Sequence, residues 1–165
     1  MRMDRIKNKR ELPHSDISEK IIGCCFEVMK ELGSGFLENV YKNALFLAMK
    51  QKGLSVSAEQ AFEVSFRGHK IGKYIADLIV ENLIIVELKC CKILLPEHQA
   101  QLINYLKASE RPVGLLVNFG SPKLEYKRLH HPDNFMELEE CSSGLLTFLK
   151  PYAENKSLDS SSCPS

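Results

Sequence analysis

Residues 83–89 read LIIVELK, and this stretch decides the predicted fold. Its four consecutive apolar residues are typical of a strand that is covered on both faces. Glu87 and Lys89 nevertheless stand at the end of the strand, with one residue between them. Side chains two apart in a strand share a face, so an acid and a base lie next to each other there. An ion pair at the rim of the sheet is one interpretation of this pattern, and a metal site is the other.

Two further strands precede this stretch and complete a predicted three-stranded antiparallel meander. Residues 61–66 (AFEVSF) alternate between apolar and polar side chains, as half-buried strands do. Residues 73–80 (KYIADLIV) form the second strand, after a turn at 67–70 (RGHK). The third strand, residues 83–90, follows a turn at Glu81 and Asn82. These three strands form the predicted centre of the fold.

Helices flank the meander along the sequence. Apolar residues at helical spacing predict helices at 16–32 and 36–51 before the meander and at 96–109 after it. Asp16 and Glu19 match a capping box at the start of the first helix. The remaining predicted strands are residues 113–120 and 123–129. The predicted order is therefore helix, helix, three strands, helix, strand, strand, which is an α/β chain of the α+β type.

The length of 165 residues is typical of one domain, which we expect at 15–130. Residues 1–14 form a basic leader that we expect to be flexible. Residues 131–165 form a C-terminal extension, with a short helix predicted within 136–152 and a Ser-rich, disordered end.

The composition limits the classes of partner. The net charge of +1 gives no overall attraction to nucleic acid, so local basic patches would have to hold such a partner. The apolar runs are too short for a membrane span, and no signal-peptide segment is evident. The six cysteines form no CxxC and no zinc or iron–sulfur spacing. We therefore expect reduced thiols and an intracellular location, in the cytoplasm or nucleus.

A third charged residue, Asp77, lies on the strand before the apolar stretch. If residues 81–83 form the connection, Val80 pairs with Ile84 and Asp77 lies directly opposite Glu87, whereas a two-residue turn would shift this register by one. Two ionised carboxylates about 5 Å apart repel by roughly 3–4 kcal/mol at an effective dielectric constant near 20. A divalent cation between them would turn this repulsion into binding, and oxygen ligands suit Mg²⁺ or Mn²⁺.

The chain contains its own control for this pattern. Glu125 and Lys127, in the sequence LEYK, have the same spacing as Glu87 and Lys89. Their strand is more polar, and no aspartate stands on a preceding partner strand. We therefore interpret Glu125 and Lys127 as an ordinary surface ion pair. Asp77 and the apolar surroundings distinguish the first pair from the second.

Three other polar residues lie at positions that could serve either structure or function. Glu38 stands in the first turn of a predicted helix, where an acid stabilises the helix dipole. Gln101 and Tyr105 are four residues apart and share a helix face. Tyrosine on such a face is usually packed, but a buried glutamine amide needs hydrogen-bond partners. The neighbouring His98 is expected to be a surface residue or a satisfied polar residue, not a ligand.

Together these residues resemble the PD-(D/E)XK nuclease superfamily. The resemblance rests on Asp77 and the triplet Glu87-Leu88-Lys89 on a meander flanked by helices. Residues 35–41 (GFLENVY) match the signature of the branch known as GxxExxY proteins. Other blocks similar to that branch are 75–89 (IADLIVENLIIVELK), 98–107 (HQAQLINYLK) and 113–120 (VGLLVNFG). The resemblance covers residues 15–129 and implies a restriction-endonuclease-like core with a mixed central sheet.

The resemblance also implies a metal site where the second and third strands diverge. Asp77 and Glu87 would bind Mg²⁺ or Mn²⁺ together with the backbone carbonyl of Leu88. Glu38 would add a further acid from the helix before the meander. Ala76 stands where the superfamily name has proline, a difference that is common in the superfamily.

Other side chains would act on the substrate. The resemblance implies that Lys89 orients and helps to deprotonate the attacking water, or stabilises charge on the phosphate. Gln101 and Tyr105 are similar to a QxxxY helix motif of RecB-like exonucleases, which lines the site and contacts Lys89 or the DNA. Basic residues that could follow a phosphate backbone near the site are Arg67, Lys70, Lys73, Lys92 and Lys107, although each would equally suit a solvated face.

The expected function is that of a metal-dependent nuclease that hydrolyses phosphodiester bonds, with DNA favoured over RNA and a role in DNA repair or recombination. The alternative is a catalytically silent nuclease fold that binds nucleic acid or a protein. The modest net charge favours this alternative, and the full set of site residues favours the enzyme. The expected partners also include a second copy of the chain, as a homodimer, but no membrane.

Overall fold

The computed structural model describes residues 12–135 of the chain. The predicted leader and the C-terminal extension with its short helix lie almost entirely outside the described residues. The elements in chain order are α1 (Ser15–Leu32), α2 (Glu38–Gln51), β1 (Val56–Phe66), β2 (His69–Val80), β3 (Ile84–Lys89), α3 (Pro96–Ser109), β4 (Val113–Asn118), β5 (Glu125–His130) and the short 3₁₀ helix η1 (Pro132–Phe135).

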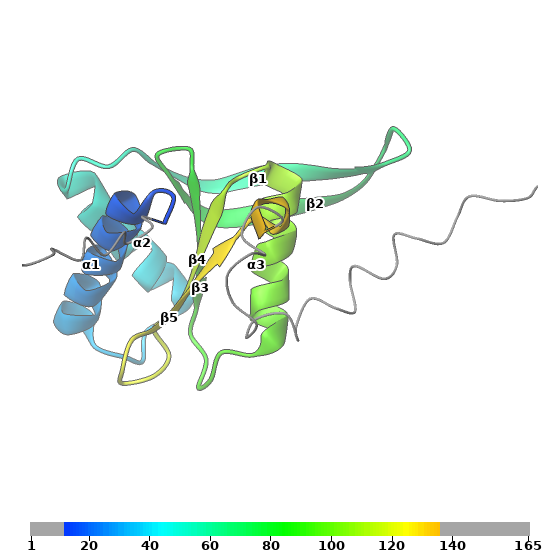
Figure 1. The fold of residues 1–165 in the computed structure, drawn as a ribbon. Coiled ribbons are helices and arrows are strands. Elements are labelled where there is room, and N and C mark those ends of the chain that lie inside the picture. The colour runs from blue at the N-terminus through cyan, green and yellow to red at the C-terminus, as the bar shows by residue number, and fades with distance from the viewer. Residues whose placement is uncertain (1–11, 136–165) are drawn as a thin grey trace, which may run out of the picture.

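A single five-stranded sheet, with strand order β1-β2-β3-β4-β5, forms the centre of the described part (Figure 1). β1, β2 and β3 form the predicted antiparallel meander. β4 then pairs parallel to β3, and β5 pairs antiparallel to β4. A parallel neighbour needs a crossover connection, which α3 provides between β3 and β4. The mixed sheet confirms the predicted α/β fold and is consistent with a restriction-endonuclease-like core.

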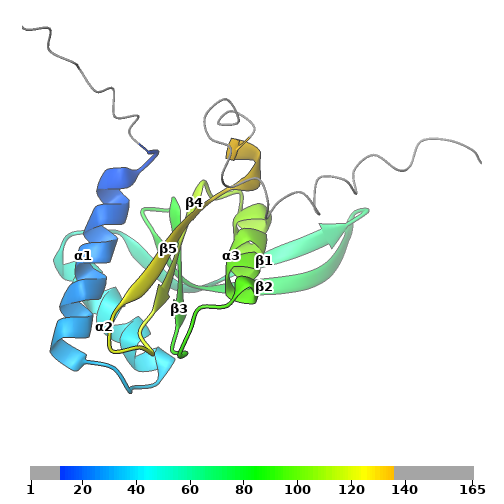
Figure 2. The same ribbon diagram turned by 60° about the horizontal axis from the view of Figure 1, so that its bottom comes forward.

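Helices cover both faces of the sheet (Figures 1 and 2). α1 and α2 pack against one face, where Ile84 and Val86 of β3 join the larger apolar core. α3 packs against the other face, where Ile85 joins a smaller core with Leu102. Alternating side chains of β3 thus enter two different cores, and residues 84–88 are all buried. This confirms that the LIIV run belongs to a strand covered on both faces, although Leu83 itself lies in the preceding turn.

The starts of several elements differ from the prediction. The Asp16–Glu19 capping box is wrong, because α1 begins one residue earlier, at Ser15, and no side chain caps it. Instead, the Ser18 hydroxyl donates a hydrogen bond to the His14 carbonyl oxygen at 3.0 Å. α2 begins at Glu38, two residues later than predicted. β1 and β2 are longer than predicted: β1 begins at Val56, where its added residues pair with the inner end of β2, and β2 begins at His69, next to the turn at the tip.

The predicted register between β2 and β3 is confirmed at the turn. Val80 pairs with Ile84, and the ladder continues to Leu78 and Val86. The ladder then ends, so Asp77 and Glu87 are not a ladder pair as predicted. Beyond this point β2 pairs only with β1, and β3 only with β4. The two strands therefore separate next to the predicted site.

The structure describes four of the six cysteines. Cys24 and Cys25 are buried in the core beneath α1, and Cys90 and Cys91 are half-buried after β3; all four are free. Burial raises the pKa of Cys25. Within residues 12–135, no helix is both long and apolar enough to cross a membrane.

Candidate active site

Asp77 lies where β2 leaves β3. Its carboxylate oxygen Oδ2 accepts a hydrogen bond from the backbone N–H of Leu88 at 2.9 Å. This bond replaces the ladder contact that would follow the Leu78–Val86 pair. Because Asp77 holds the neighbouring strand through its side chain, its carboxylate is fixed within the opening between the two strands.

Glu87 is a buried acid, with 3% of its surface exposed. Its Oε1 atom accepts a hydrogen bond from the Lys89 ammonium at 2.8 Å. Its other oxygen, Oε2, is buried and has no hydrogen-bond partner. Burial, followed by the nearby charge of Asp77, raises the pKa of Glu87 to about 7, and the hydrogen bond from Lys89 offsets only part of this. The predicted ion pair between Glu87 and Lys89 is therefore present, but it satisfies only half of the carboxylate.

Lys89 is the cation of this group. Burial by itself would lower its pKa, but the hydrogen bond to Glu87 and the charges of Glu38 and Asp77 outweigh burial and raise it. The ammonium group therefore stays charged at neutral pH. Three carboxylates act on one lysine, which shows that the structure brings these four predicted site residues together.

Glu38 approaches the end of β3 from the first residue of α2. Burial raises its pKa first and Asp77 raises it further, while Lys89, Lys42 and a backbone hydrogen bond from Cys90 lower it. A carboxylate at a helix start gains stability from the helix dipole, as the sequence suggested. Because the charges of Asp77 and Lys89 act on Glu38, the structure places Glu38 near these two predicted site residues.

Sequence reasoning missed a second lysine at the site. Lys42 lies one turn after Glu38 on α2, and its pKa is raised by a hydrogen bond to Glu59 and by the charges of Asp77 and Glu38. Its ammonium donates this bond to Glu59 Oε1 at 2.7 Å. Glu59 has a left-handed backbone (φ 55°) in the middle of β1. The available signal was the four-residue spacing from Glu38, which places Lys42 on the same helix face.

α3 supplies the wall of the site opposite α2. The Gln101 side-chain amide donates a hydrogen bond to the Tyr105 hydroxyl at 2.8 Å. Burial raises the pKa of Tyr105, the bond from Gln101 lowers it, and the charge of Glu87 raises it further. The Tyr105 ring meets Tyr74 of β2 edge-to-face, with ring centres 5.1 Å apart. The resemblance implied that this motif contacts either Lys89 or the DNA. Among the hydrogen bonds of the described residues, Gln101 binds Tyr105 and not Lys89.

The end of β3 is held in place by the segment after β4. The Phe119 N–H donates a hydrogen bond to the Lys89 carbonyl oxygen at 2.8 Å. The fully buried Asn118 side chain accepts a hydrogen bond from the N–H of Cys91 at 3.0 Å and donates one to its carbonyl oxygen at 2.8 Å. A Cβ atom on Gly120 would lie 2.3 Å from the Cys91 nitrogen. Close packing at this point fixes the position of Lys89.

The oxygen atoms at the site fit a hard divalent cation. Glu87 Oε2 is a buried carboxylate oxygen without a partner, which is costly unless a cation or a proton satisfies it. Asp77 and the Leu88 carbonyl are the other predicted ligands. Within residues 12–135, no three His, Cys, Asp or Glu side chains form a metal-binding group. A metal here would therefore rely on two carboxylates and the backbone carbonyl, with Glu38 outside this set.

Two other predictions made from charged residues need correction. Arg67, Lys70 and Lys73 lie on the outer part of the β1–β2 ribbon, not beside the predicted metal site. Glu125 accepts a hydrogen bond from Asn118 at 3.1 Å, and the described residues show no ion pair between Glu125 and Lys127.

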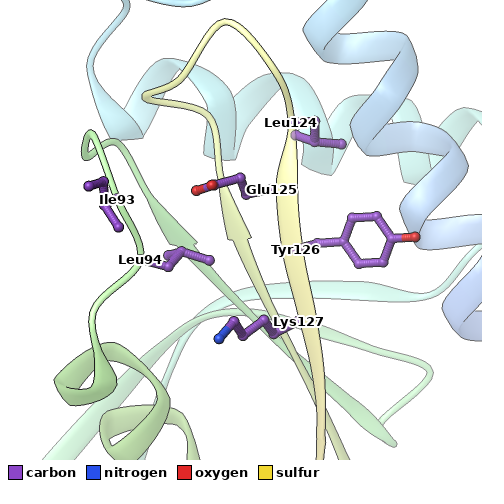
Figure 3. Close-up of a pocket in the computed structure, with 6 residues that line it drawn as sticks. All are labelled: Ile93, Leu94, Leu124, Glu125, Tyr126 and Lys127. Atoms are coloured by element: carbon purple, nitrogen blue, oxygen red, sulfur yellow. The ribbon is translucent and has the colours of Figure 1, made fainter.

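A shallow pocket lies on the β5 side of the sheet. Figure 3 shows Glu125 and Lys127 pointing toward the segment after β3, whereas Leu124 and Tyr126 point the other way. The pocket has a volume of about 430 Å³ and is lined by Ile93, Leu94, Leu124, Glu125, Tyr126 and Lys127. It contains none of the predicted site residues.

His98, at the start of α3, is a satisfied polar residue, as expected. Its Nδ1 atom accepts a hydrogen bond from the Leu95 N–H at 3.1 Å.

Comparisons with solved structures give distant similarities. The crystal structure of SSO0001 is 21% identical with a TM-score of 0.49, and the match covers 77% of this chain and 65% of that chain. The chain thus spans slightly less than two thirds of the length of SSO0001. An alkaline exonuclease from Laribacter hongkongensis, LHK-Exo, is 11% identical with a TM-score of 0.45, covering 79% of this chain and 77% of that chain. LHK-Exo in complex with dAMP is 12% identical with a TM-score of 0.42, covering 74% and 87%.

Comparison with protein sequences assigns the family. No curated protein matches the chain. The profile of the PD-(D/E)XK nuclease superfamily, however, matches residues 15–129, which is well over half of the sequence. The matched region contains every strand of the sheet except the last residue of β5. The chain belongs to the PD-(D/E)XK nuclease superfamily.

Proposed function

We propose that this protein is a divalent-metal-dependent nuclease of the GxxExxY branch that hydrolyses phosphodiester bonds in DNA. The observation that carries the proposal is the Glu87 carboxylate. One of its oxygens is bound to Lys89 at 2.8 Å, and the other is buried without a partner. A fold gains no stability from such an atom, but a carboxylate oxygen that no other group occupies is available to bind a metal ion.

Asp77, Glu87 and the Leu88 carbonyl would hold Mg²⁺ or Mn²⁺, whose chemistry when bound is to polarise a phosphoryl oxygen and to acidify water. Lys89 would donate hydrogen bonds to the attacking water and to a phosphate oxygen. Glu87 keeps the ammonium of Lys89 in place, so little reorganisation is needed when the substrate arrives. Glu38, whose pKa is raised by burial, would accept a proton near the end of β3.

The remaining residues of the site would shape the space for the substrate. Gln101 and Tyr105 would orient the nucleic acid from α3, since their hydrogen bond fixes both polar groups at the wall of the site. Lys42 would exchange its bond to Glu59 for a substrate phosphate. The proposal further includes an intracellular role in DNA repair or recombination, in which the protein acts as a homodimer.

Cleavage assays on linear, circular and branched DNA and on RNA, each with Mg²⁺, with Mn²⁺ and with EDTA, test the activity. Asp77→Ala and Lys89→Ala should each reduce cleavage by at least about 100-fold, because each removes a group that stabilises charge in the transition state. Lys127→Ala is the matched control, since Lys127 occupies the same position in LEYK as Lys89 in VELK. Equal cleavage by the wild type and both site variants would refute the proposed activity.

A catalytically silent nuclease fold is the competing function. It is favoured by the lack of a three-side-chain metal group within residues 12–135. Isothermal titration calorimetry with Mn²⁺ separates the two functions. Binding by the wild type but not by Asp77→Ala or Glu87→Gln supports the nuclease, and no binding by any of these proteins supports the silent fold.

A further inference from the structure

The β1–β2 ribbon extends beyond the body of the protein as a hairpin arm, defined here as residues 61–75. Figures 1 and 2 show the arm projecting past α3 on the side away from α1 and α2. β2 pairs with β3 only from Leu78 to Val80, whereas its pairing with β1 continues to Phe66 and His69. The arm is therefore a two-stranded ribbon, a form that gains little stability by itself.

Large apolar side chains are exposed along the hairpin arm. Phe66 at the tip is 57% exposed, and Ile71 and Ile75 on β2 are 64% and 52% exposed. None of these three residues belongs to either apolar core. Several exposed apolar residues gathered on one projecting element indicate a surface that meets a partner.

The charge of the arm selects the kind of partner. Glu63 is the only acid between residues 61 and 75, whereas Arg67, Lys70 and Lys73 are basic. Lys70 is bound to Glu63 at 2.6 Å, so Arg67 and Lys73 supply the excess positive charge. The Arg67 guanidinium lies over the Phe66 ring, 5.0 Å from its centre. An exposed aromatic ring beside a guanidinium is a surface on which nucleic-acid bases stack and phosphates bind.

The hairpin arm is continuous with the candidate active site. β2 carries Asp77 at its inner end and the arm at its outer end. At the base of the arm, Tyr74 contacts Tyr105 of the site wall. At about 3.3 Å per residue, the distance from Asp77 to the tip at Gly68 is about 30 Å, which corresponds to about nine nucleotides of one strand.

We propose that the hairpin arm binds the nucleic acid that flanks the bond to be cleaved. Arg67 and Lys73 contact its phosphates, and Phe66 stacks against a base or sugar at the far end. This inference rests on the proposed nuclease function. It assigns the sequence-predicted basic residues of the arm to binding at a distance from the metal site, not to the cleavage step.

Fluorescence anisotropy in EDTA, with labelled DNA of about 30 nucleotides and of about 6 nucleotides, tests this assignment, because only the longer DNA can reach from the site to the tip. Phe66→Ala/Arg67→Ala should weaken binding of the long DNA by about tenfold or more and leave the short DNA within about twofold. The matched control is Leu47→Ala/Lys30→Ala, which removes one exposed apolar residue and one exposed cation from the helical layer.

The outcomes distinguish the two proposals. Two results would refute the role of the arm but not the nuclease function, provided that the wild type cleaves DNA. One is an equal loss of binding by both double variants. The other is equal binding by the arm variant and the wild type. A wild type that neither binds nor cleaves DNA would refute both proposals. If the arm variant instead changes the molar mass in light scattering and leaves DNA binding intact, the arm contacts a second copy of the chain and the inference is wrong. Thermal unfolding checks that both double variants are folded.

Discussion

The Asp77 carboxylate accepts a hydrogen bond from the Leu88 N–H at 2.9 Å, at the point where β2 and β3 separate. One predicted metal ligand thus holds the backbone of another in place. Asp77 has a structural role as well as its proposed chemical role, and the two can be separated by mutation.

Asp77→Asn keeps an oxygen that can accept the Leu88 N–H but removes the negative charge. We expect this variant to retain its thermal stability and to lose Mn²⁺ binding. Asp77→Ala should lose Mn²⁺ binding and also about 1–3 kcal/mol of stability, because the Leu88 N–H is left without a partner. Urea unfolding and calorimetry with Mn²⁺ measure the two effects. Equal stability of the Ala and Asn variants would mean that the hydrogen bond does not hold the strands together.

Glu87 should make stability depend on pH. Its pKa rises from an ordinary value of 4.5 to about 7 in the folded protein, chiefly because the group is buried. The folded state therefore holds the proton more tightly than the unfolded chain. The contribution of the protonated Glu87 to the free energy of unfolding is present in full below pH 4.5, declines as the pH rises, and is lost above about pH 7. The size of this decline should be on the order of 3 kcal/mol.

Glu87→Gln imitates the protonated acid and should lack this decline, so above pH 7 it should be more stable than the wild type. Mn²⁺ should restore stability at high pH to the wild type but not to the variant. Urea unfolding at a series of pH values, with and without Mn²⁺, measures both effects. Glu125→Gln serves as the control and should show the same decline as the wild type. A pH-independent difference between Glu87→Gln and wild type would contradict the assignment.

Lys42 should have opposite effects on metal and substrate. Its positive charge lies near Asp77 and Glu38, so it opposes cation binding but favours phosphate binding. Lys42→Met should tighten Mn²⁺ binding by roughly threefold to tenfold in the absence of DNA, and it should slow DNA cleavage. Glu59→Gln removes the negative charge of the Lys42 partner but leaves the positive charge of Lys42 in place, so it should not tighten Mn²⁺ binding. A Lys42→Met variant with weaker binding of both Mn²⁺ and DNA would indicate a purely structural role.

Gly120 should be intolerant of a side chain. An added Cβ would lie 2.3 Å from the Cys91 nitrogen and 2.5 Å from the Cys90 carbonyl carbon, so the backbone after Lys89 would have to move. Gly120→Ala should cost about 1–3 kcal/mol of stability or more, and it should reduce cleavage by displacing Lys89. Gly23→Ala is the matched control, because nothing lies within 4 Å of its added Cβ. As an exposed helical position, Gly23→Ala should stabilise the protein by about 0.5–1 kcal/mol.

Local pattern was enough to predict much of the fold. The apolar run before Glu87 identified the doubly covered strand. The sequence left its register with β2 open between two lengths of turn, and the structure shows the three-residue connection that pairs Val80 with Ile84. The start and end of α3 at Pro96 and Ser109 also followed from the sequence. These features depend on periodicity and turn chemistry within a few residues, which the order of amino acids specifies directly.

The tertiary structure alone decided the properties that carry the chemistry. The ladder ends after Leu78, and the Asp77 side chain replaces the next backbone contact. Glu87 retains an oxygen without a partner only because α3 and the rest of the sheet exclude solvent from it, and this exclusion raises its pKa. The hydrogen bond between Lys42 and Glu59, seventeen positions away in the chain, also forms only in the folded protein. Burial and electrostatic coupling depend on which distant segments come together, and no local pattern of residues encodes that.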